Sequence, residues 1–208
     1  MYTLYFSPGA CSLATHAVLN EIGQEVHIID KQSIDDFVQI NPVGAVPVLI
    51  DGGKTLTEGA AIMLHILKAH PNKLFPMDDA AQQIAVQNIM FANATMHPAY
   101  SRLFFLEHAM EDQTLKHQVM NTAAKSINVL WQVVEEKLNN QAFLGGNQPS
   151  AADFMLTVYS RWGAMFPVDI VIGPNTTNML QAIQGRSSFV KAISREQAVS
   201  EVSPQTQE

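Results

Sequence analysis

The residue best suited to chemistry is Cys11, the only cysteine among 208 residues. It follows the turn-forming segment Ser7-Pro8-Gly9-Ala10 and lies at the predicted first turn of a helix. Unpaired backbone N–H groups and the positive end of the helix dipole favour a thiolate there, and such positions can lower a thiol pKa from about 8.5 to well below 7.5. A buried cysteine that acts as a small apolar side chain is the alternative, and position alone favours neither.

No second cysteine is present to form a disulfide with Cys11, so a Cys-x-x-Cys redox cycle within one chain is excluded. If Cys11 takes part in redox chemistry, the second thiol must come from a small molecule, and glutathione is the obvious candidate in a reducing cytosol. The single cysteine, with no signal peptide and no membrane-spanning apolar stretch, predicts a cytoplasmic protein that does not enter the membrane.

Two further segments have backbone features suited to binding. Pro47 opens a predicted strand, where a cis bond would turn the Val46 backbone outward toward a ligand; an ordinary trans proline is the alternative. Glu58-Gly59 precedes a predicted helix, whose first N–H groups can bind a carboxylate while the Glu58 side chain pairs with an amine. That combination suits an α-amino acid group, and a simple helix cap is the alternative.

His97 lies four residues after Asn93, so the two side chains share one helix face. A lone histidine is more often a structural or surface residue than a catalyst, so a functional role for His97 needs independent support. The sequence predicts no metal site and no tightly bound cofactor.

The elements that position these residues are predicted to form two domains. Strands are predicted over residues 2–6, 26–29, 47–50 and 54–57, and helices over 12–22, 34–40 and 60–68. A parallel pair joined to an antiparallel pair gives a four-stranded mixed sheet flanked by helices. The first domain therefore spans residues 1–72.

Residues 80–208 are predicted as an all-helical domain, because helical periodicity replaces the strand pattern after the linker. Ser150 and Asp153 resemble a capping box at the start of an apolar helix that runs to about Trp162. Later helices are predicted from Pro174 and, briefly, over 189–193, with a polar, frayed tail after about Glu196.

The composition excludes some classes of function. Apolar residues make up 47% of the chain and charged residues 15%, which argues for an ordered core and against disorder. The net charge of −7 makes nucleic acid a poor candidate partner.

Three blocks of the first domain, in this order, resemble the bacterial beta-class, cysteine-type glutathione transferases. They are YFSPGACSL at 5–13, NPVGAVPVL at 41–49 and LTEGAAI at 56–62, and the segments GG at 145–146, SAADF at 150–154 and RW at 161–162 add support. The resemblance implies a thioredoxin-like domain followed by a helical bundle, assembled as a homodimer.

The resemblance also implies how glutathione binds as a co-substrate. The backbone of Val46, before a cis Pro47, pairs with the cysteinyl part, and Lys31 aligns with a lysine that meets the glycyl carboxylate. The remaining contacts come from Ala10 and Cys11 beside the sulfur, with Cys11 able to form a mixed disulfide, and from Glu58 and Gly59 at the γ-glutamyl end.

In the second domain, His97 matches the family's histidine near the glutathione sulfur, and Tyr100 and Trp162 match positions that line the apolar co-substrate pocket. Two positions depart from the family pattern. Pro98 replaces a basic residue, and Met90 replaces an asparagine that reaches glutathione in the partner subunit. Asn93, one helical turn nearer to His97, is the candidate substitute.

The expected activity is conjugation of glutathione to small electrophiles, thiol transfer to disulfides through Cys11, or both. In conjugation Cys11 donates a hydrogen bond as a thiol, whereas in thiol transfer it is the nucleophile. A non-catalytic regulatory protein, like the stringent starvation proteins on this fold, is the alternative, because fold does not determine function. A glutathione-dependent isomerase or dehalogenase is a third possibility.

Overall fold

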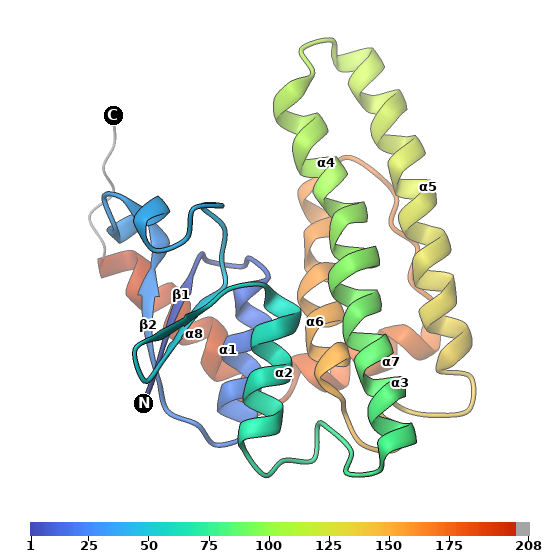
Figure 1. Cartoon of the computed structure of the whole chain (residues 1–208). Helices are drawn as coiled ribbons and strands as arrows, with labels where there is room; N and C mark the ends of the chain where they lie inside the picture. Colours follow the sequence, from blue (N-terminus) through green and yellow to red (C-terminus); the bar gives the residue numbers. More distant parts are fainter. Residues whose placement is uncertain (203–208) are drawn as a thin grey trace. The chain divides into compact units, whose positions relative to one another are not determined.

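The structure is a computed structural model that describes residues 1–202, and these residues fall into two compact units (Figure 1). Unit 1 contains Met1–Asn72 together with the segment that begins at Gln184, and unit 2 contains Lys73–Ile183. The predicted boundary differs at the C-terminal side, because the last helix belongs to unit 1 and not to the helical unit.

Unit 1 is built on a four-stranded mixed sheet, as predicted. Its strands are β1 (Tyr2–Phe6), β2 (Val26–Asp30), β3 (Val48–Asp51) and β4 (Lys54–Leu56). The spatial order is β2-β1-β3-β4, with β1 parallel to β2 and the other two pairs antiparallel. Leu4, Phe6 and Val48 are completely buried, so the central strands carry the core of this unit.

Helices α1 (Ser12–Glu21) and α2 (Gly59–Ala69) follow the predicted positions closely. The predicted helix over 34–40 is wrong. The chain instead makes two short 3-10 turns, η1 (Lys31–Ser33) and η2 (Phe37–Gln39), because Ile34 between them is extended, with φ −111° and ψ 115°.

Helix α8 (Ser187–Val202) is longer than the short final helix predicted, and the expected fraying after Glu196 is wrong as far as Val202. Its polar residues bond to the rest of unit 1. Arg195 donates to the carbonyl of Val26 at 3.1 Å, and the Ser200 hydroxyl donates to the Asp30 carboxylate at 2.6 Å. These bonds explain why a polar segment stays helical; residues 203–208 lie outside the described part of the chain.

Unit 2 is helical, as predicted. Its elements are α3 (Asp79–Met90), a π-helical segment η3 (Phe91–Met96), α4 (His97–Ala109), α5 (Gln113–Lys137), α6 (Ala151–Ser160), the 3-10 segment η4 (Arg161–Met165) and α7 (Pro174–Gln184). Within residues 1–202, none of the helices combines the length and apolar character needed to cross a membrane.

The capping box at the start of α6 is confirmed. The Asp153 carboxylate accepts hydrogen bonds from the Ser150 N–H at 2.7 Å, the Ser150 hydroxyl at 2.8 Å and the Leu144 N–H at 3.0 Å. Asp153 is completely buried, so it ties the 144–150 loop to the helix that carries part of the candidate site.

Candidate functional site

Cys11 lies at the N-cap of α1, at the end of the turn that follows β1. The N–H of Ala10 closes this turn by donating to the Ser7 carbonyl at 3.1 Å. The Cys11 thiol donates to the carbonyl of Val46 at 3.2 Å, and the Val46–Pro47 peptide bond is cis, as predicted. Unit 1 thus brings together two blocks that are far apart in the sequence.

The position of Cys11 in the sequence left a stabilised thiolate and a buried thiol as alternatives, and its surroundings favour the thiol. Burial raises the pKa of the thiol to about 11, and the backbone hydrogen bonds of Cys11 and Ser12 offset only part of that effect. The sequence showed the helix start that favours a thiolate but not the packing around the half-buried Cys11. Cys11 is therefore a protonated thiol at neutral pH.

The loop before Pro47 is held by its own side chains and by Lys31. The Asn41 amide donates to the Ala45 carbonyl at 2.8 Å, and its oxygen accepts from the Val43 N–H at 3.2 Å. The Lys31 ammonium donates to the Gly44 carbonyl. These hydrogen bonds hold the loop that carries the Val46 backbone. Lys31, a predicted site residue, is bonded to the same loop.

Glu58 adopts an unusual backbone conformation at the N-cap of α2, with φ 69° and ψ 112°. Within residues 1–202 it is the one non-glycine residue with positive φ, a conformation that costs about 1–3 kcal/mol and often marks functional positions. Its side chain is exposed, and Gly59 begins the helix with no side chain over the first N–H groups. The sequence indicated Glu58 and Gly59 but not this conformation.

In unit 2, His97 and Trp162 lie in one aromatic cluster. The His97 ring meets the edges of Trp162 and Tyr159, with centroids 5.3 Å apart in each pair. Phe104 lies 5.7 Å from Trp162 and 4.8 Å from Phe166. Burial lowers the pKa of His97, so its imidazole is neutral at neutral pH.

Tyr100 lies deeper than its predicted place in a pocket lining. The residue is completely buried, and its hydroxyl accepts a hydrogen bond from the Trp131 indole at 2.9 Å. Its ring contacts Trp162 at 5.9 Å, so Tyr100 supports the cluster from the core. Burial raises its pKa to about 12.

Asn93 lies in the π-helical segment η3, just before His97 begins α4. Single π-helical turns inside longer helices are frequent at functional sites. Pro98 accounts for the widened turn, because it has no N–H to donate to the carbonyl four residues earlier and its ring clashes with that carbonyl. Pro98, which departs from the family pattern, therefore explains why the backbone at Asn93 is π-helical.

Sequence reasoning missed Phe104, Tyr159 and Phe166. Phe104 follows Tyr100 by four residues on one helix face, so helical spacing offered a way to find it. Phe166 comes after the 3-10 segment η4, where no regular period predicts which side chains turn inward.

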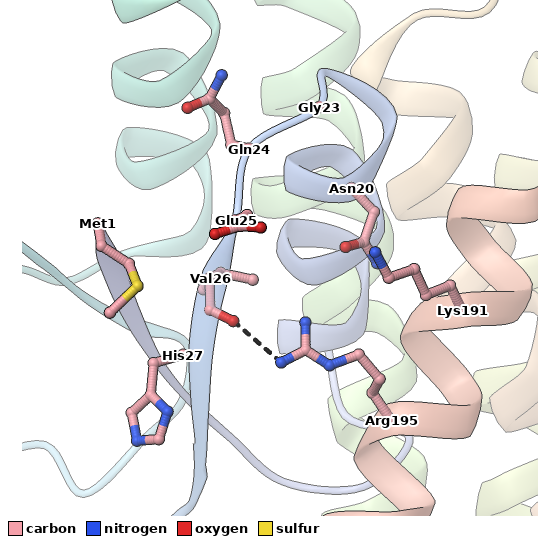
Figure 2. A pocket seen from close by; sticks show the side chains of 9 residues that line it. All are labelled: Met1, Asn20, Gly23, Gln24, Glu25, Val26, His27, Lys191 and Arg195. Carbon is pink, nitrogen blue, oxygen red and sulfur yellow. Dashed lines mark hydrogen bonds between the residues drawn. The ribbon is translucent and has the colours of Figure 1, made fainter.

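A separate polar cavity of about 550 Å³ lies on unit 1, beside α8 (Figure 2). It is lined by Met1, Asn20, Gly23, Gln24, Glu25, Val26, His27, Lys191 and Arg195. None of the predicted glutathione residues lines it. The charges of Arg195 and Lys191 help burial lower the pKa of nearby His16 to about 4.

Across residues 1–202, no cluster of three or more His, Cys, Asp or Glu side chains is arranged to hold a metal ion. Unit 1 instead offers a thiol, main-chain groups and a strained glutamate as candidate binding groups. Unit 2 offers aromatic rings and a neutral histidine. These groups suit a peptide-like thiol and an apolar co-substrate.

Comparisons with known proteins identify the family of this chain. Sequence models of the glutathione S-transferase N-terminal and C-terminal domains match residues 1–68 and 94–184. A glutathione S-transferase, GST-4.5 of Xanthomonas campestris pv. campestris, is 32% identical, covering 80% of this chain and 85% of the relative. The chain belongs to the glutathione S-transferase family, which is a family of enzymes.

Solved structures show the same fold. A beta-class glutathione S-transferase from Sphingomonas chungbukensis superimposes with a TM-score of 0.80 at 30% identity, covering 93% of this chain and 98% of its own. A sphingomonad glutathione S-transferase complexed with glutathione gives 0.83 at 29% identity, covering 94% and 98%. Unit 1 is thus a thioredoxin-like domain and unit 2 the helical domain of this family.

Proposed function

We propose that this chain conjugates glutathione to small electrophiles, and that thiol transfer through Cys11 is a slower activity. The observation that supports this order is the protonated Cys11 thiol, with its pKa raised to about 11 and its proton donated to Val46. A thiol can donate a hydrogen bond to a glutathione thiolate, whereas a second thiolate would repel it. Rotation about the Cβ–Sγ bond swings the proton from the carbonyl to the bound sulfur.

Main-chain and charged groups of unit 1 hold glutathione in this proposal. The Val46 backbone pairs with the cysteinyl residue, and Lys31 meets the glycyl carboxylate. Glu58 pairs with the γ-glutamyl ammonium, while the N–H groups that begin at Gly59 bind the neighbouring carboxylate. The strained Glu58 backbone supports this assignment, because such conformations persist where function requires them.

The electrophile is proposed to bind the aromatic cluster of unit 2. Trp162 and Phe104 offer ring faces and edges to an apolar, preferably aromatic, compound, and Tyr100 supports them from the core. His97 is proposed to act at the glutathione sulfur.

The protein is proposed to be a cytoplasmic homodimer. Phe105 is 70% exposed and Val129 60% exposed on the helices of unit 2, as expected of side chains that a second copy would cover. Asn93 is proposed to take the place of the family's cross-subunit asparagine, which Met90 replaces. Light scattering that gives the mass of one chain would contradict the dimer.

Cys11→Ser and Cys11→Ala test the catalytic proposal in two assays. With 1-chloro-2,4-dinitrobenzene and glutathione, Cys11→Ser keeps a donor and should stay within about threefold of wild type, whereas Cys11→Ala should lose about 100-fold. Thiol transfer to a glutathione mixed disulfide should be slow in the wild type and absent in both variants. Wild-type thiol transfer that exceeds conjugation, or conjugation unchanged in Cys11→Ala, would overturn the proposal.

A further inference from the structure

Ser101 lies one helical turn after His97 on α4 and makes two short contacts with it. Its hydroxyl oxygen is 3.0 Å from the His97 carbonyl oxygen and 3.3 Å from His97 Nδ1. Both residues are half-buried, and the His97 ring packs against Tyr159 and Trp162, whose own centroids lie 4.7 Å apart. The aromatic pair and the Ser101 hydroxyl therefore both restrict the orientation of the His97 ring.

Counting hydrogens assigns the direction of each bond. The single hydroxyl proton of Ser101 can go to only one of the two partners, and the shorter distance favours the His97 carbonyl, which can only accept. The hydroxyl oxygen then has only lone pairs to offer to Nδ1, and that nitrogen must carry the ring proton. In a neutral imidazole, Nε2 is left as an acceptor.

We propose that Ser101 is a positioning residue that holds His97 in the Nδ1–H tautomer, so that Nε2 is available to take the proton of the glutathione thiol. The role at the sulfur rests on the proposed function, whereas the tautomer does not. The two contacts with Ser101 use Nδ1 and the main-chain carbonyl of His97, so neither of them occupies the lone pair of Nε2. The lowered pKa of His97 keeps the ring neutral, as an acceptor requires.

The proton and electrons balance when the thiol attacks an electrophile that carries a leaving group. The S–H bond breaks and its proton goes to Nε2, while the sulfur electron pair forms the new S–C bond. The leaving group departs with its bonding pair, and the imidazolium then releases its proton to water. An Nε2–H tautomer would instead present a donor to the thiol and could not take its proton.

The matched variants are Ser101→Ala, which removes the hydroxyl, and Ser101→Thr, which retains one able to bond the same carbonyl. The tautomer is measured directly by nitrogen NMR of protein labelled at histidine, with His97→Gln used to assign the signal. This measurement needs no glutathione. A failure to bind glutathione would therefore contradict the proposed function but would leave the assignment of the His97 tautomer unaffected.

Wild type and Ser101→Thr are expected to show the proton on Nδ1, and Ser101→Ala is expected to shift it toward Nε2. Conjugation should fall about tenfold in Ser101→Ala and remain near wild type in Ser101→Thr, a small part of the 10²–10⁴-fold typical of acid–base catalysis. A wild-type ring protonated on Nε2, or a tautomer unchanged in Ser101→Ala, would overturn the assignment.

Discussion

The two units present their candidate functional groups in different ways. In unit 1 the candidate groups come from short contiguous blocks and act largely through the main chain, as with Val46, Gly59 and the strained Glu58. In unit 2 they are side chains from α4, α6 and η4 that meet only in the folded unit. In the proposed function, recognition of glutathione therefore depends on backbone geometry, while the contacts with the electrophile depend on replaceable aromatic side chains.

The units also share one property. Each holds a candidate proton-handling group in its neutral form by burial, which raises the pKa of Cys11 and lowers that of His97. The Cys11 thiol donates a hydrogen bond to the Val46 carbonyl, and His97 is proposed to act as an acceptor. Burial therefore keeps both side chains uncharged at neutral pH.

The largest expected effect tests whether burial keeps the Cys11 thiol protonated. Because the thiol pKa is about 11, alkylation by iodoacetamide should speed up about tenfold per pH unit, or about 1,000-fold from pH 7 to pH 10. The rate is measured by mass spectrometry, with Cys11→Ala as the unreactive control. A rate that levels off below pH 8 would mean a stabilised thiolate.

The next effect concerns the scaffold of unit 2. Asp153→Ala leaves two N–H groups and a hydroxyl without their buried acceptor, so we expect a loss of about 3 kcal/mol in unfolding free energy. The exposed Asp169→Ala is the control and should stay within about 0.5 kcal/mol. Urea unfolding that shows equal stability for the two variants would contradict this role of the capping box.

A smaller, pH-dependent effect tests unit 1 through buried His16, which lies 3.3 Å from Glu196 and feels the charges of Arg195 and Lys191. Its folded-state pKa is about 4, below the ordinary 6.5, so the unfolded chain binds more protons and stability falls as pH drops from 6.5 to 4. The slope is at most about 1.4 kcal/mol per pH unit. His16→Asn removes this contribution and should flatten the curve; an unchanged slope would rule His16 out as its source.

The smallest effect separates backbone strain from charge at Glu58. Glycine tolerates positive φ, so Glu58→Gly should be more stable than Glu58→Ala by about 1 kcal/mol, although both lack the carboxylate. Thermal unfolding of the two variants measures the difference. Equal stability would show that this conformation stores no strain.

The contrast between the units explains what could be predicted. Cys11, Val46-Pro47 and Glu58-Gly59 lie in blocks whose turn and cap chemistry is local, and the alternating strands predicted the sheet of unit 1. The direction of the Cys11 pKa was left open by the sequence because burial depends on distant packing. The length of α8 was missed because Arg195 and Ser200 look like solvent-facing polar residues until their partners in β2 are known.

The site in unit 2 was harder to predict for the same reason. His97 and Trp162 were found by resemblance, but the rings of Tyr159 and Phe166 were not. Tyr159 is one of many apolar side chains in α6, and Phe166 follows the 3-10 segment η4. The role of Ser101 depends on two distances that only the folded helix provides.

The most direct test of the central claim is glutathione binding by calorimetry on wild type, Glu58→Ala and the control Glu25→Ala, an exposed acid of the same unit. We expect wild type and Glu25→Ala to bind with dissociation constants between micromolar and low millimolar, and Glu58→Ala to bind about 10–100-fold more weakly, because a hydrogen bond to a charged group is worth about 1.5–3 kcal/mol. No binding by the wild type, or equal binding by all three, would contradict the proposed glutathione site.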